Sequence, residues 1–214
     1  MKKIDNYEDW QLANSKIFWG EISPCDHVVQ IYENDAIFLD VLTGFVGGGI
    51  NSGDCVIVIA TEDHLAALAN RLRSSGIRED ALISNEQFIP INAQDALAEF
   101  MVNDWPDEDK FNKFISLLLK RARKHGRRVR AFGEMVALLW AEGNAGATVR
   151  LEHLWKQFCD NETFCLFCAY PKTGSTMNIM DSIHDICSSH TKMITTLDKP
   201  SSELYYRHID RKAS

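Results

Sequence analysis

The stretch HVVQIYENDAIFLD, residues 27–40, joins two patterns that together indicate an α/β fold. The β-branched run at 28–32 predicts a strand, and the apolar residues of 35–50 predict a helix that is buried on nearly every side. In many α/β proteins that bind phosphate groups, the turn between two such elements is rich in glycine. The turn here is YEND (32–35), which has no glycine and no lysine. The sequence therefore predicts such a scaffold without its phosphate loop.

The alternation of strands and helices continues along the chain and predicts a mostly parallel sheet of five or more strands, with helices on both faces. The Val- and Ile-rich run at 55–60 is typical of a strand that is covered on both sides. Pro90 favours an edge position or a strand end for the run at 87–91. We predict strands at 28–32, 55–60, 87–91, 128–132 and 164–170, and helices at 35–50, 61–74, 93–103, 107–125, 133–143, 146–160 and from Met177 to about Ile194.

The chain is predicted to have three parts. Residues 1–22 carry several aromatics without a clear period and are expected to form an arm or a short helix on the body. Residues 23–175 are expected to form the α/β domain. Residues 176–214 are expected to form a C-terminal helix and a polar tail that pack on this core.

Composition limits the classes of function. The formal net charge of −7 disfavours nonspecific nucleic-acid binding as the main activity. A basic run, KRARKHGRRVR (120–130), is interpreted as a solvated helix end rather than a phosphate-binding patch. The first residues lack the apolar stretch of a signal peptide, and no apolar run approaches the ~18–20 residues of a membrane-spanning helix. We therefore expect a cytoplasmic protein with mostly reduced cysteines.

The cysteines and histidines do not predict a metal site or any other cofactor site. Cys165 and Cys168 form a C-x-x-C, but they lie in a predicted strand, where positions i and i+3 face opposite sides. We interpret them as buried free thiols that are not set beside a histidine. In the predicted tail helix, His184 and His190 are rotated by about 120° from each other, so they do not easily meet at one ion. His184, Cys187 and His190 remain as an alternative metal set.

Polar and aromatic residues follow the predicted strands at their carboxyl ends, where parallel sheets bind ligands. This pattern predicts a small-molecule pocket, although loop ends are polar in any α/β protein. Glu33 and Glu134 could pair as an acid and a base, but no Ser-His-Asp pattern accompanies them, so we do not predict an enzyme. The predicted ligand-binding residues are Tyr32, Glu33, Asn34, Thr61, His64, Arg130, Phe132, Glu134 and Tyr170.

Four blocks of the sequence resemble one known family. They are HVVQIYEN, GDCVIVIATEDHLAAL, RRVRAFGEMVALLW and FCLFCAYP, in this order, and the likeness covers about residues 25–175. The family is MEDS, the methanogen/methylotroph, DcmR sensory domain, which looks like a degenerate relative of the KaiC/RecA ATPase core. The resemblance implies that 32–35 stands in the phosphate-loop position and that 128–139 stands where a magnesium-binding acidic strand would lie.

The resemblance also implies a function. Family members are regarded as sensory modules for small, hydrocarbon-derived ligands, and they occur beside histidine kinase or DNA-binding modules. The chain is therefore expected to be a stand-alone sensory module that signals through a partner, such as a histidine kinase, a transcription regulator or a second copy of itself. Tyr32 and Tyr170 are expected to stack on an apolar ligand, with Arg130 and Glu134 holding a polar group or each other. The alternative is a residual nucleotide-binding protein or an enzyme on the same core.

Overall fold

The computed structural model describes residues 10–12, 19, 22–171, 190–195 and 203–207. Its centre is an eight-stranded sheet with the order β1-β10-β9-β2-β8-β7-β3-β4. The six strands from β9 to β4 are parallel, and β10 runs antiparallel to both β9 and β1. The strands are β1 (Trp10–Leu12), β2 (His27–Tyr32), β3 (Cys55–Ala60), β4 (Phe88–Asn92), β7 (Val129–Gly133), β8 (Cys165–Pro171), β9 (Lys192–Thr195) and β10 (Glu203–Arg207).

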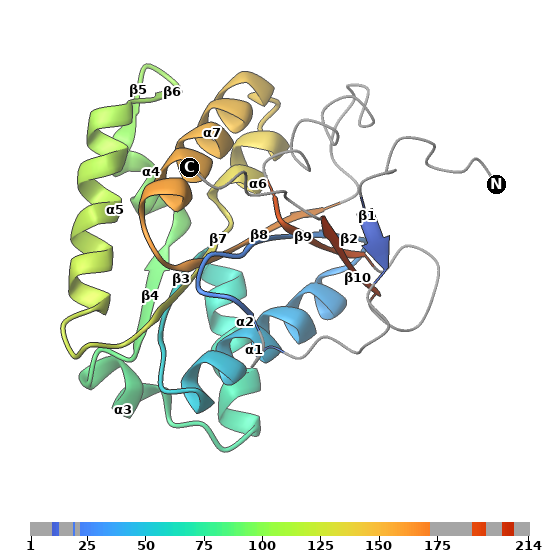
Figure 1. Ribbon diagram of the computed structural model, residues 1–214, viewed down its shortest axis with the longest axis vertical. Coiled ribbons are helices and arrows are strands. Elements are labelled where there is room, and N and C mark those ends of the chain that lie inside the picture. Colours follow the sequence, from blue (N-terminus) through green and yellow to red (C-terminus); the bar gives the residue numbers. More distant parts are fainter. Residues whose placement is uncertain (1–9, 13–18, 20–21, 172–189, 196–202, 208–214) are drawn as a thin grey trace, which may run out of the picture.

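Helices cover both faces of this sheet and complete a three-layer fold (Figure 1). On one face, α1 and α2 pack over the even residues of β2 and β3; on the other, α4 to α7 pack over the odd residues. Helices cover these strands on both faces, so the side chains of both faces are buried. Consecutive residues are therefore buried throughout β2, β3 and β7 and in most of β8. The helices are α1 (Asp35–Asn51), α2 (Glu62–Ser74), α3 (Glu79–Ser84), α4 (Ala93–Phe100), α5 (Glu108–Ala122), α6 (Met135–Ala141) and α7 (Ala145–Asn161).

Most helices begin at a side chain that accepts a backbone N–H of the first turn. Asn34 caps α1, Thr61 caps α2 and Asn92 caps α4 in this way. Because Thr61 immediately follows β3 and Asn92 is the last residue of β4, these caps direct the chain out of the sheet at its carboxyl edge. The predicted edge position of the strand that contains Pro90 is confirmed, because β4 is the last strand of the sheet.

Several predicted boundaries were wrong. The helix expected at 93–103 ends at Phe100 and is followed by a hairpin, β5 (Met101–Val102) and β6 (Trp105–Pro106). Its turn residues Asn103 and Asp104 both have positive φ, 51° and 59°, as a type I′ turn requires. The helix expected at 107–125 ends at Ala122, and α3 was not predicted.

The predicted tail helix also needs correction. It was expected to reach about Ile194, but Lys192–Thr195 form β9, which pairs in parallel with β2. Backbone hydrogen bonding to a distant strand therefore overrides the local pattern in this segment. The rest of the predicted helix, including His184 and Cys187, lies outside the described residues.

The basic run at 120–130 is compensated by carboxylates of the same chain. Arg121 and Lys124 contact Glu86, at 3.1 Å in each case, and Arg123 contacts Glu162 at 2.6 Å. These ion pairs agree with the interpretation of the run as a charged helix end. None of the helices that the structure describes is long and apolar enough to cross a membrane.

Candidate functional site

A histidine and a glutamate meet at the carboxyl edge of the sheet. His64 Nδ1 lies 2.7 Å from Glu134 Oε1, and the side chains are 16% and 6% exposed. The second carboxylate oxygen, Oε2, accepts the backbone N–H of Thr61 at 2.9 Å. Both oxygens of this partly desolvated carboxylate are therefore satisfied, and the contact is charge-assisted when His64 is protonated.

The order of the strands brings these residues together. β3 and β7 are neighbours, so the residues that leave their carboxyl ends lie side by side. After β3, Thr61 caps α2 and places His64 in its first turn. After β7, the N–H of Glu134 donates to Ile59 O at 2.8 Å, which ties the start of α6 to the end of β3.

The Glu134 contact changes the proton affinity of His64. It raises the pKa of His64, because the hydrogen bond to the carboxylate favours the charged imidazolium, whereas partial burial acts in the opposite direction. The hydrogen bond uses Nδ1, so Nε2 is the ring atom through which His64 can meet a ligand.

Aromatic rings continue this site toward β2. Phe38 of α1 lies 4.9 Å from the His64 ring, and Tyr32 stacks on Phe38 with ring centroids 4.8 Å apart. Phe132 of β7 packs on Phe38 from the other side, at 5.6 Å. Burial, helped by the nearby Glu134 charge, raises the pKa of the Tyr32 hydroxyl, which stays protonated.

The turn at 32–35, which the resemblance aligns with a phosphate loop, does not suit an anion. Asn34 Oδ1 already accepts the N–H of Ile37 at 3.0 Å, and Asp35 adds a carboxylate to the first turn of α1. A phosphate would have to displace the cap and approach a negative charge, which removes the usual attraction of a helix N-terminus for anions. Glu33 and Asn34 are both exposed.

Two of the predicted site residues lie elsewhere. Arg130 sits near the amino end of β7, is 3% exposed, and donates to Asp54 Oδ2 and to Trp19 O, both at 2.7 Å. It does not pair with Glu134, because three residues of β7 (131–133) lie between the two positions. We correct its assignment from ligand contact to a buried structural ion pair.

Tyr170 lies on the opposite face of the sheet from Tyr32. In the register of β2 and β8 it stands beside Ile31, and its side chain belongs to the core under α7. Its hydroxyl donates to Glu152 Oε1. The two tyrosines thus cannot stack on the same ligand. Burial raises the pKa of Glu152 to about 7, and the Tyr170 hydrogen bond opposes this shift.

Sequence reasoning missed Gln30, which precedes Tyr32 by two residues on the same face of β2. Gln30 is 0% exposed, and its side-chain Nε2 and Oε1 have no hydrogen-bond partner in the structure as described. A glutamine within an apolar run was the available signal, because a buried amide needs partners for both of its polar atoms.

Sequence reasoning also missed a group of side chains on the face of the sheet that α7 covers. His27, Glu152, Cys168 and His190 come together there, and Cys168 Sγ lies 3.5 Å from His27 Nε2. The expectation that the buried cysteines are not set beside a histidine is therefore wrong. The predicted separation of Cys165 from Cys168 is confirmed, since they belong to different cores.

Comparisons with known proteins identify the fold and the family. A KaiC-like protein from the hyperthermophilic archaeon Pyrococcus horikoshii OT3 has a similar structure, with a TM-score of 0.57, 9% sequence identity and coverage of 89% of this chain and 83% of that chain. At this identity the likeness shows the fold alone, a KaiC/RecA-like three-layer core. No curated protein matches the chain. The model of the methanogen/methylotroph, DcmR sensory domain matches residues 26–191, and the chain therefore belongs to the MEDS family of sensory domains.

Proposed function

We propose that this chain is a sensory module that binds a small, mainly apolar organic molecule carrying one polar group. The proposed site lies on the α1 side of the sheet, from Gln30 past Tyr32 and Phe38 to His64. The observation that carries the proposal is the buried Gln30 amide, which lacks a partner among the described residues.

An unsatisfied buried amide is costly, about 1–3 kcal/mol for each polar group left without a partner. A ligand with one hydroxyl, carbonyl or amine group would remove this cost, while its carbon atoms would contact the rings of Tyr32 and Phe38. His64 Nε2 offers a second polar contact at the more exposed end of the site. These features favour a small, weakly polar ligand.

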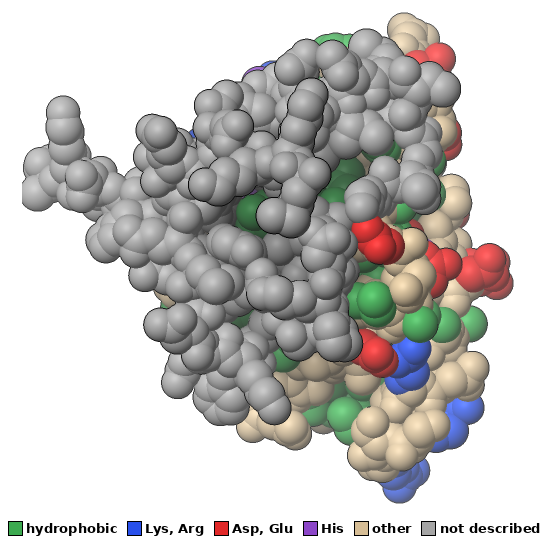
Figure 2. Space-filling model, turned by 90° about the vertical axis from the view of Figure 1, so that its right-hand side faces the viewer, with side chains coloured by type: hydrophobic (Ala, Val, Ile, Leu, Met, Phe, Trp, Pro, Cys, Tyr) green, Lys and Arg blue, Asp and Glu red, His purple; other side chains and the backbone are tan. Residues whose placement is uncertain are grey.

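The alternative, a nucleotide, is less consistent with the site. The N-terminus of α1 is capped by Asn34 and carries Asp35, so it offers little to a phosphate group. Nucleic acid is also disfavoured as a partner. On the described part of the side shown in Figure 2, acidic and hydrophobic side chains are mixed, and most of the visible Lys and Arg side chains lie toward the lower end.

The signal is proposed to pass through β9 to a partner protein. Gln30 stands beside Ile194 of β9 in the sheet register, and β9 leads into β10. A ligand that reorients Gln30 would therefore act on the strand pair β9–β10. A histidine kinase, a transcription regulator or a second copy of the chain is the proposed receiver of this change.

The test is a thermal-shift screen with small alcohols, amines, ketones and halogenated hydrocarbons, and with ATP and magnesium. A ligand present at about 100 times its Kd stabilises the folded state by about 2.7 kcal/mol. We expect an organic compound to raise the melting temperature of the wild-type protein but not of Gln30→Leu. The variant itself should melt at the same or a higher temperature, because it removes an unsatisfied amide.

Gln94→Leu is the matched control, since Gln94 is exposed on α4 at the other face. It should keep the full ligand response. A response that survives in Gln30→Leu would place the ligand elsewhere. A magnesium-dependent shift with ATP would favour the nucleotide-binding alternative, for which the His64–Glu134 pair is the available general base.

A further inference from the structure

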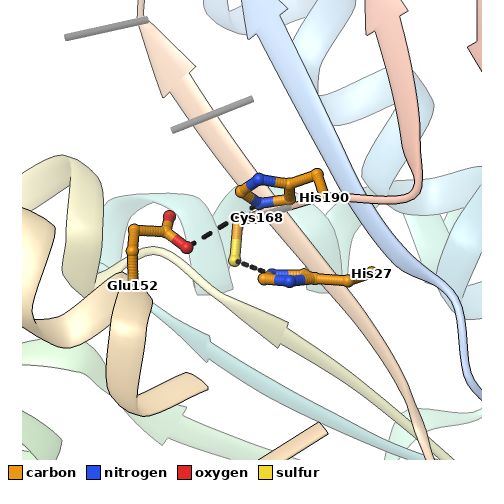
Figure 3. A group of neighbouring side chains, drawn as sticks. All are labelled: His27, Glu152, Cys168 and His190. Carbon is orange, nitrogen blue, oxygen red and sulfur yellow. Dashed lines mark hydrogen bonds and ion pairs between the residues drawn. The ribbon is translucent and has the colours of Figure 1, made fainter. Parts of the chain in front are cut away.

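Four potential metal ligands converge on the face of the sheet opposite the proposed sensory site (Figure 3). The donor atoms of His27, Glu152, Cys168 and His190 all lie within 4.8 Å of one another. Cys168 Sγ is 3.5 Å from His27 Nε2, Glu152 Oε2 is 3.8 Å from His190 Nε2, and the two imidazole rings are 3.9 Å apart. All four residues are at most 3% exposed.

The topology of the sheet explains how distant residues meet here. Cys168 lies in β8 and His27 in the adjacent strand β2, where Cys168 stands beside Val29. His190 lies just before β9, the other neighbour of β2. Glu152 points toward them from α7, which covers this face. The backbone fixes both histidines, because Thr191 N donates to His27 O at 2.7 Å.

The Glu152 carboxylate points to a missing partner. Its Oε1 accepts the Tyr170 hydroxyl, but Oε2 accepts no hydrogen bond in the described structure and faces the other three side chains. A carboxylate oxygen that is wholly buried and aimed into a group of thiol and imidazole side chains is rare unless it binds a cation.

We propose that His27, Glu152, Cys168 and His190 bind one divalent transition-metal ion of the zinc class. Two imidazoles, a thiolate and a carboxylate form the N/S/O set that Zn²⁺ takes in tetrahedral sites. The thiolate and the carboxylate together balance the charge of a divalent ion, which suits a fully buried position. Ca²⁺ and Mg²⁺ are excluded because they require a shell of oxygen ligands.

Two of the donor-atom distances are close to those of a bound site, and the others are within 4.8 Å. Zinc–ligand bonds of about 2.0–2.3 Å place tetrahedral donor atoms about 3.3–3.6 Å apart. The Cys168–His27 contact already has this spacing, and the Glu152–His190 contact is slightly longer. Tyr170 supplies an outer hydrogen bond that orients the carboxylate, as is usual around metal ligands.

The number of protein ligands indicates what the ion would do. Four protein ligands leave no open position for a substrate, so the ion would have a structural or regulatory role rather than a catalytic one. His190 precedes β9, so the ion would hold the β9 segment to β2 and β8. The inference does not depend on the proposed sensory site, which lies on the other face of the sheet.

The test uses Co²⁺ as a spectroscopic substitute for Zn²⁺. The 214-residue chain is stripped with a chelator and titrated with Co²⁺ under reducing conditions. We expect saturation at a single ion per chain, tetrahedral ligand-field bands in the visible region and a sulfur-to-cobalt charge-transfer band in the near ultraviolet. Zn²⁺ should displace Co²⁺ and bleach these bands.

Matched variants locate the ion. Cys168→Ala should lose the charge-transfer band, whereas Cys165→Ala, a buried cysteine of the same strand that faces the other core, should keep it. Glu152→Gln provides a second test that preserves an acceptor for Tyr170, and it should weaken Zn²⁺ binding. Tyr170→Phe should weaken binding by about 10–100-fold, the usual effect of losing an outer partner.

Metal-free melting curves and circular dichroism spectra show whether each variant is folded. The proposal is overturned if the wild-type chain shows no saturable Co²⁺ binding. It is equally overturned if folded Cys168→Ala keeps the sulfur band, or if folded Glu152→Gln binds Zn²⁺ as tightly as the wild type.

Discussion

The two faces of the central sheet treat buried charge differently. On the α1 side, the charged side chains are paired: Arg130 with Asp54 near the amino edge, and His64 with Glu134 at the carboxyl edge. On the α7 side, Glu152 is equally buried, but one of its oxygens has no hydrogen bond in the described structure. The carboxylates of Asp54 and Glu134 are thus saturated by groups of the protein, whereas Glu152 keeps an oxygen for the metal ion that we propose.

The largest expected effect comes from breaking the pair at the amino edge. Arg130→Ala leaves Asp54 buried without its buried partner and should lower the free energy of unfolding by about 3–5 kcal/mol. Arg128→Ala is the control, because Arg128 contacts the same carboxylate from an exposed position and should cost about 1 kcal/mol or less. Urea unfolding at neutral pH measures both losses, and equal losses would contradict a special role of the buried pair.

A smaller loss of stability is expected when each of the two buried glutamates, Glu134 and Glu152, is replaced by glutamine. Glu134→Gln replaces one acceptor oxygen with an NH₂ group that faces a donor, so it should cost about 1–3 kcal/mol. In metal-free protein, Glu152→Gln should cost less, because the amide keeps an oxygen for Tyr170 and removes a buried carboxylate with one unbonded oxygen. Chemical denaturation of both variants makes the comparison, and the reverse order would disprove the distinction between the two faces.

The smallest effect concerns pH. Because the pKa of His64 is raised in the folded state, its pairing with Glu134 contributes full stability below the unfolded histidine value of about 6.5. This contribution is lost as the pH rises through the pKa of the folded state. The stability lost in His64→Gln should therefore be greater at about pH 6 than at about pH 9. His153→Gln, on an exposed residue of α7, is the control, and a pH-independent loss for His64→Gln would show that the pair is not charge-assisted.

Much of the fold could be predicted because apolar patterns are local. The runs at 28–32 and 55–60 are apolar except for Gln30, and both form strands covered by helices on two sides. The strand at Lys192–Thr195 was not predicted, because four residues carry too weak a pattern and the partner strand β2 lies far away in the sequence. The turn at Asn103 and Asp104 did have a signal, since these residue types tolerate positive φ.

The candidate sites were harder to predict because contacts across the sheet depend on register. The spacing of His64 after β3 and of Glu134 after β7 correctly placed both at one edge. Arg130 was misplaced, because a strand position alone does not show that Asp54, from another loop, neutralises it. The meeting of Cys168 with His190 required a strand that sequence reasoning had assigned to a helix.

The pairing of β1 with β10 has a consequence for the order of folding. β1 lies at Trp10–Leu12 and its partner at Glu203–Arg207, so, among the described strands, the first to be synthesised pairs with the last. The core strands β2, β3, β7 and β8 are complete before β10 exists. Among the strand pairs that the structure describes, this one has the largest sequence separation, so this edge of the sheet can close only after the other described strands have been made.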